Sequence, residues 1–130
     1  MKIYLVLALI ALFVVLLGSC GETFNTTGKD IVFPESKVSF QNHVYPFLKL
    51  NCSYSGCHSD ETQAGGIVLT YYSTLFYSAG LVINGDPDKS RLVQIIEGSL
   101  PHFTFYYRGN ITENHKIGMR KWIAEGAINN

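Results

Sequence analysis

The chain carries the run Asn51-Cys52-Ser53-Tyr54-Ser55-Gly56-Cys57-His58. Two cysteines close together, with a histidine directly after the second, are typical of covalent haem attachment. In that chemistry the sulfurs form thioethers with the two haem vinyl groups, and the adjacent imidazole ligates the iron. The usual gap between the cysteines is two residues, whereas four residues separate Cys52 from Cys57. The stretch predicts one covalent haem c, attached at Cys52 and Cys57 and ligated by His58.

The N-terminus predicts export, which covalent haem attachment requires. Lys2 precedes an unbroken apolar run from Ile3 to Leu17, and Gly18-Ser19-Cys20 follows. The run is shorter than the roughly 20 apolar residues that span a bilayer and ends in small residues, so residues 1–19 are interpreted as a signal peptide. The alternative is an uncleaved N-terminal membrane helix. In both cases the domain belongs to the cell envelope and faces the periplasm or the cell exterior.

The segment Leu17-Gly18-Ser19-Cys20 resembles a bacterial lipobox. The resemblance implies cleavage before Cys20 and attachment of lipid to its sulfur. Two acyl chains already suffice for stable anchoring. The chain has three cysteines, so lipid at Cys20 and haem at Cys52 and Cys57 would use all of them.

The composition of the chain limits the kinds of partner and cofactor that it is expected to bind. The chain has ten basic and ten acidic residues and no basic stripe, so nucleic-acid binding has no support. It also has eight tyrosines, eight phenylalanines and one tryptophan. Such residues can wall in a flat cofactor, although an ordinary aromatic core would look similar.

The apolar pattern predicts an all-α domain of several short helices with little or no sheet. Residues 20–37 are expected to be a flexible tether and residues 38–130 the haem domain. We expect helices near 40–48, 71–78, 87–97 and 113–125, and extended stretches at 64–69 and 81–83. Ser39 and Thr112 are predicted N-caps, Asp86 is expected to cap the third helix and Gly98 to end it. Pro46 is expected to kink the first helix.

Over residues 38–130 the chain resembles the bacterial cytochrome c domains often called planctomycete-type, which occur in many membrane lipoproteins. The matching pieces are Val38-Ser39-Phe40, Val44-Tyr45-Pro46-Phe47, Cys52 with Ser55-Gly56-Cys57-His58, Ala64-Gly65-Gly66, Leu69-Thr70, Gly85-Asp86-Pro87-Asp88-Lys89-Ser90 with Leu92, Ile111-Thr112, and Trp122-Ile123-Ala124-Glu125-Gly126-Ala127. The family tolerates a four-residue gap between the haem cysteines. The resemblance implies a cytochrome c-like fold in which the first and last helices cross, with Phe47 and Trp122 in the core near the crossing.

The family's sixth iron ligand is usually a methionine in the loop before the last helix. Here residues 99–110 contain no methionine. His102 is the predicted distal ligand, because imidazole is a common haem ligand. The alternatives are no protein ligand, Met119, which has core spacing within the last helix, or a tyrosine at position 106 or 107.

These residues predict a membrane-anchored monohaem c-type cytochrome that carries single electrons between redox partner proteins and is not an enzyme. One alternative is a haem-based sensor or gas-binding lipoprotein with an open sixth site. Another is an interaction lipoprotein without haem, held by a Cys52–Cys57 disulfide. A zinc site is a further reading of Cys52, Cys57 and His58, but adjacent Cys-His is not a usual zinc spacing.

Overall fold

The computed structural model describes residues 30–102 and 110–130. Its elements are the π-helix η2 (Phe40–Val44), α2 (Tyr45–Asn51), the 3₁₀ turns η3 (Ala64–Gly66) and η4 (Ser73–Phe76), α3 (Arg91–Glu97) and α4 (Glu113–Ala124). These two ranges contain no β-strand, which confirms the predicted all-α class. They also contain no helix long and apolar enough to cross a membrane. The predicted signal peptide, Cys20, and the aromatic residues Phe103, Phe105, Tyr106 and Tyr107 lie outside the described residues.

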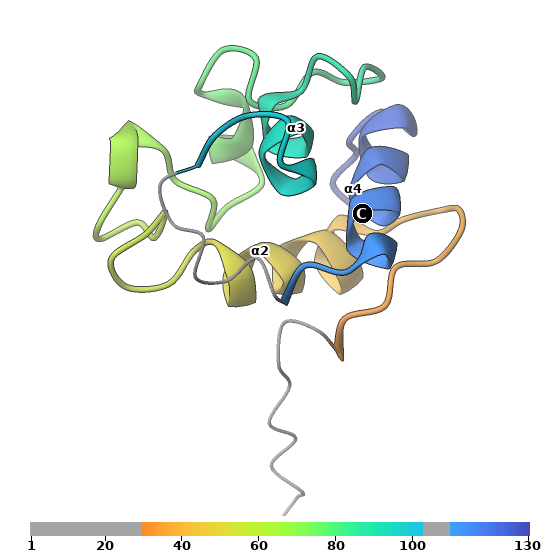
Figure 1. Cartoon of the computed structure of the whole chain (residues 1–130), viewed down its shortest axis with the longest axis horizontal. Coiled ribbons are helices and arrows are strands. Elements are labelled where there is room, and N and C mark those ends of the chain that lie inside the picture. The colour runs from red at the N-terminus through yellow and green to blue at the C-terminus, as the bar shows by residue number, and fades with distance from the viewer. Residues whose placement is uncertain (1–29, 103–109) are drawn as a thin grey trace, which may run out of the picture.

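The first and last helices pack across each other, as expected. Figure 1 shows α4 rising from the η2–α2 pair, with α3 beside its upper part. The rings of Phe40 in η2 and Trp122 in α4 lie 5.8 Å apart between centroids. Trp122, Phe47 and Met119 are all fully buried. The core prediction for these side chains is therefore confirmed, and Met119 belongs to the core.

The first helix begins as expected but is built differently around Pro46. The Ser39 hydroxyl accepts a hydrogen bond from the Asn42 backbone N–H, which confirms the N-cap. The next turn is a π-helix, closed by the Tyr45 N–H on the Phe40 carbonyl. Pro46 then occupies the first turn of α2, where its missing N–H is tolerated. The expected kink inside one α-helix is thus replaced by a π-to-α transition before the proline.

Three local predictions were wrong. The helix expected at 71–78 is only the 3₁₀ turn η4. Residues 64–66 form the 3₁₀ turn η3, with positive φ at Gly65 and Gly66, and the chain becomes extended only at Ile67. The third helix begins at Arg91 rather than Pro87, because Asp86 accepts from the Lys89 N–H and closes a separate turn. Two expected boundaries are confirmed: Gly98 ends α3 with φ 83°, and the Thr112 side chain caps α4.

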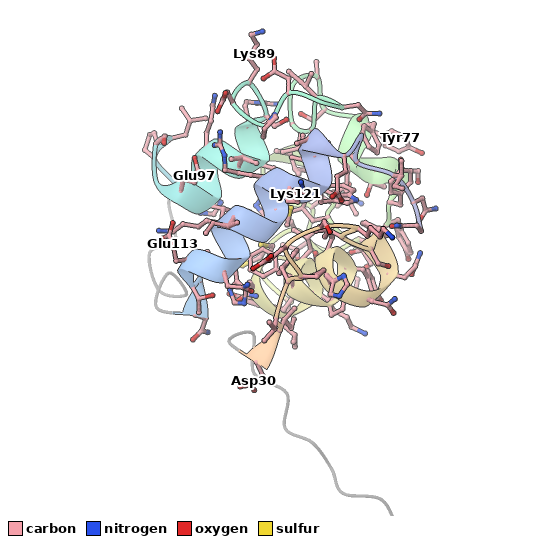
Figure 2. The ribbon with its side chains drawn as sticks, turned by 90° about the vertical axis from the view of Figure 1, so that its right-hand side faces the viewer. Asp30, Tyr77, Lys89, Glu97, Glu113 and Lys121 are labelled. Atoms are coloured by element: carbon pink, nitrogen blue, oxygen red, sulfur yellow. The ribbon has the colours of Figure 1, made fainter. Side chains whose placement is uncertain are left out.

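The chain is already packed at residues 31–33, within the predicted tether. Ile31 and Phe33 are buried. Both backbone groups of Phe33 are bonded by Asn114: its Oδ1 accepts from the Phe33 N–H at 2.8 Å, and its Nδ2 donates to the Phe33 carbonyl at 2.9 Å. Gly118 lies beneath the Phe33 ring, so closely that a methyl group there would overlap it. This N-terminal strap, residues 31–33, is therefore part of the domain. Figure 2 shows it entering beside α4 at Asp30.

Candidate functional site

The loop after α2 returns Cys57 and His58 to the helix end. Cys52 is the C-cap of α2. The Cys57 N–H then donates to the Tyr54 carbonyl at 3.0 Å, and the His58 N–H donates to the Cys52 carbonyl at 3.0 Å. Gly56 has φ 87°, a conformation that other residues rarely adopt. The four-residue gap is thereby closed into one compact loop.

Cys52, Cys57 and His58 line one cavity, and the remote His102 lines it with them. Its apolar walls come from α3 and from separate loops: Ile67, Leu69, Leu81, Leu92, Ile95, Ile96 and Ile111. The volume of the cavity is about 130 Å³. Small-molecule and cofactor sites are concave and mostly apolar, with a few convergent polar groups. This cavity has that character.

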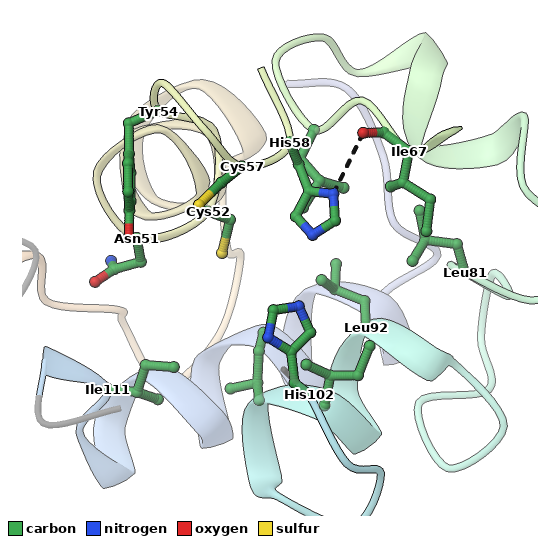
Figure 3. A pocket seen from close by; sticks show the side chains of 13 residues that line it. Asn51, Cys52, Tyr54, Cys57, His58, Ile67, Leu81, Leu92, His102 and Ile111 are labelled. Atoms are coloured by element: carbon green, nitrogen blue, oxygen red, sulfur yellow. Dashed lines mark hydrogen bonds between the residues drawn. The ribbon is translucent and has the colours of Figure 1, made fainter. Parts of the chain in front are cut away.

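The rings of His58 and His102 face each other across the cavity (Figure 3), with their centroids 5.8 Å apart and their planes inclined by 53°. The Nδ1–H of His58 donates to the Ile67 carbonyl over 3.3 Å. A carbonyl can only accept, so this bond leaves Nε2 of His58 as the unprotonated nitrogen available to a metal. Burial is the main cause that lowers the pKa of His58, and the neighbouring His102 lowers it further, against the hydrogen bond to Ile67. The ring is held neutral, as a metal ligand requires.

Both cysteines are free thiols in the structure. Burial, with a smaller contribution from Cys57, raises the pKa of Cys52 to about 12. Cys52 is therefore a neutral thiol against an apolar wall. In Figure 3 both sulfurs lie on one side of the histidine pair, and Ile67 and Leu81 lie on the other.

Asn51 is a site residue that sequence reasoning missed. Its Nδ2 donates to the Phe47 carbonyl, and its Oδ1 is buried on the cavity wall with no hydrogen-bond partner among the described residues. The signal was present, because a polar side chain one turn after Phe47 interrupts the apolar face of α2. Tyr54, inside the cysteine loop, also lines the cavity.

The other predicted candidates are placed apart from the cavity or fall outside the description. Met119 is buried in the core and does not line the cavity. Tyr106 and Tyr107 belong to residues 103–109, which are not described. Within residues 30–102 and 110–130, no group of three or more His, Cys, Asp or Glu side chains is arranged to hold a metal ion. No protein-family model, curated protein or solved structure matches this chain.

Proposed function

We propose that the chain is a c-type cytochrome that holds one haem in this cavity and carries single electrons. Cys52 and Cys57 would form the thioethers, His58 would be the proximal ligand and His102 the distal ligand. The proposal includes a cytochrome c-like fold of the planctomycete type. The observation that carries it is the pairing of His58 with His102 across an apolar cavity that has both cysteines on one side.

The spacing of the two rings fits a single iron atom between them. Metal–imidazole bonds are about 2 Å long, and a ring nitrogen lies about 1.1 Å from its centroid when the ring bonds are about 1.33 Å. Two imidazoles on opposite sides of one metal therefore have centroids about 6 Å apart. The separation of 5.8 Å between His58 and His102 is close to this value. Two protein imidazoles favour a six-coordinate carrier over an open, gas-binding site.

The bound haem would supply a one-electron Fe(II)/Fe(III) couple. The protein's part is to hold and insulate it. The Ile67 carbonyl fixes the orientation and protonation of the His58 ring, and such a partner raises the basicity of a metal-bound imidazole. The isoleucine and leucine walls exclude water, which strengthens every electrostatic interaction at the site.

Placement in the cell follows from the N-terminal sequence. We propose that lipid on Cys20 anchors the domain to a membrane of the cell envelope. There it would exchange electrons with redox proteins on the periplasmic or outer side. The packed chain begins by Ile31, so about ten residues would separate the lipid from the domain, or at most roughly 35 Å of extended chain.

Mass spectrometry of protein matured in a bacterial periplasm tests the haem. We expect the mass of one haem on the peptide that contains Cys52 and Cys57, and a pyridine haemochrome spectrum of a c-type haem. The Cys52→Ala/Cys57→Ala double variant is the control and should carry no covalent haem. Loss of two hydrogens instead of a gain of haem would show a Cys52–Cys57 disulfide and refute the proposal.

The distal ligand is tested by His102→Ala, with His43→Ala as the matched control. His43 lies in η2, and its Nδ1 accepts from the Ser39 N–H, outside the cavity walls. The wild-type protein and the His43 variant should be low-spin by electron paramagnetic resonance, and their ferrous forms should bind no carbon monoxide. The His102 variant should lose the low-spin signal and bind carbon monoxide. Carbon monoxide binding by the wild-type protein would instead support the sensor alternative.

A further inference from the structure

The N-terminal strap and α4 present two large aliphatic side chains to solvent where they pack together. Val32 is 71% exposed and Ile117 is 59% exposed, whereas Ile31 and Phe33, on either side of Val32, are buried. The strap cannot turn Val32 inward, because its two neighbours already occupy the core. Val32 and Ile117 are therefore fixed as surface residues of the folded domain.

The bonds that hold the strap bring both side chains to the same part of the surface. Asn114 is hydrogen-bonded to both backbone groups of Phe33, and Gly118 lies beneath the Phe33 ring. Ile117 follows Asn114 by three residues, and residues at this spacing are neighbours on a helix surface. Val32 directly precedes Phe33 in the chain. Val32 and Ile117 together are called the strap face below.

The strap face is small and its surroundings carry little net charge. Glu113 and Lys116, on the same helix, neutralise each other as an ion pair at 3.0 Å. A stable protein–protein interface buries about 800 Å² on each partner, which is far more than two aliphatic side chains offer. The strap face is therefore suited to a partner that a second attachment already holds close to the domain.

The lipid proposed at Cys20 is such an attachment. Residues 21–30 separate Cys20 from Ile31, and ten residues span at most roughly 35 Å when extended. A short linker turns a second contact into an intramolecular one, with an effective concentration on the order of millimolar. A weak apolar contact with the bilayer is then enough, and apolar side chains can enter the boundary between lipid headgroups and acyl chains.

We propose that the strap face docks on the lipid surface of the membrane that carries the Cys20 anchor. This inference rests on the proposed function, since it requires the lipid. Figure 2 shows Asp30, at the start of the strap, at the lower edge of the molecule below α4. Among the described residues, those that line the cavity include none from the strap or from α4. Contact with lipid and electron transfer would thus use different surfaces of the domain.

Hydroxyl-radical footprinting with mass spectrometry tests the contact on the matured chain. Lipidated wild-type protein in phosphatidylcholine vesicles is compared with Cys20→Ala protein, exported with a cleavable signal peptide and mixed with the same vesicles. Labelling of Val32 and Ile117 should be about threefold lower in the lipidated protein, because side chains buried at the headgroup boundary are shielded from water. Tyr77 and Ile128, which are also exposed, should be labelled equally in both. Equal labelling of Val32 and Ile117 in the two samples overturns the inference.

Ile117→Asn is compared with Tyr77→Asn in the same vesicles, with the lipid at Cys20 retained. Both residues are exposed, so neither substitution should disturb the core. Ile117→Asn should raise the labelling of Val32 about twofold or more, because half of the apolar contact is lost, and Tyr77→Asn should not change it. The inference fails if Ile117→Asn leaves Val32 as protected as in wild type.

Two further outcomes separate the occupant of the strap face from the anchor itself. Protection of Val32 that disappears when the protein is spread over more vesicles would identify a second copy of the chain as the occupant and would overturn docking on lipid. A Cys20 peptide without lipid in the mass spectrum would be a different result, because it defeats the proposed anchoring on which the inference rests.

Discussion

Replacing Gly118 with alanine tests how the N-terminal strap is held on α4. A methyl group at position 118 would lie 2.2–2.3 Å from the Cβ, Cγ and Cδ1 atoms of Phe33. The Cβ and Cγ atoms stay in place when the Phe33 ring rotates, so a rotation of the ring cannot relieve the overlap. Phe33 is buried, with its ring against Phe47 and His115. The strap must therefore move away from the helix.

The expected magnitude follows from three contributions. Alanine in place of glycine stabilises a helix interior by about 1 kcal/mol. Overpacking a core costs about 1–3 kcal/mol when neighbours can adjust, and full loss of a buried phenylalanine costs about 3–5 kcal/mol. Because all three overlapping atoms are close to the Phe33 backbone, we expect a cost near that of losing a buried phenylalanine. The net loss of unfolding free energy for Gly118→Ala should be about 2–4 kcal/mol.

Urea denaturation followed by circular dichroism measures this loss, on wild-type and variant proteins of equal haem content. A double-mutant cycle with Phe33→Ala supplies the control. With the ring removed, the added methyl group has space, and Gly118→Ala should now stabilise the protein by about 1 kcal/mol. The reasoning is refuted if Gly118→Ala stabilises the protein while Phe33 is present, or still destabilises it after Phe33 is truncated.

Two further predictions concern the other attachments of the N-terminal residues. His115 is fully buried; its Nδ1 accepts a hydrogen bond from the Thr112 N–H, and its Nε2 donates one to the Ile31 carbonyl. Because His115→Leu leaves both backbone groups unpaired, the variant should lose about 2–4 kcal/mol of unfolding free energy in urea denaturation. A loss under about 1 kcal/mol would contradict the pairing. Glu125 accepts from the backbone N–H groups of residues 37 and 38, and these bonds are the main cause that lowers its pKa from 4.5. Its ionised form therefore stabilises the fold above about pH 4.5, and this contribution is lost as the pH falls through the lower, folded-state pKa. Glu125→Gln should be less stable than wild type at pH 7, and the difference should close in thermal melts below pH 4.5; a difference independent of pH would argue against the ionised carboxylate as the cause.

Local sequence patterns predicted most of the helices and their ends. Ser39 and Thr112 cap helices, and Gly98 ends one, because each acts on backbone groups within a few residues of itself. The same local character explains the wrong start of α3. Asp86 and Pro87 are good starting residues for a helix, but the Asp86 side chain closes a turn with the Lys89 N–H. The hydroxyl of the fully buried Ser90 accepts a hydrogen bond from the Ile83 N–H and donates one to the Asp86 carbonyl. These bonds separate the turn from the helix.

The residues of the haem attachment hypothesis could be found without the structure, because Cys52, Cys57 and His58 are close along the chain and one short loop brings them together. It also identified His102 as a candidate from its residue type and its place before the last helix. That the His102 ring lies opposite the His58 ring, with the two ring centroids 5.8 Å apart, is visible only in the folded chain. Apolar periodicity and capping residues indicate hydrogen bonds between groups that are only a few residues apart along the chain. The separation of two side chains from distant parts of the chain depends on how α3, α4 and the N-terminal strap pack together.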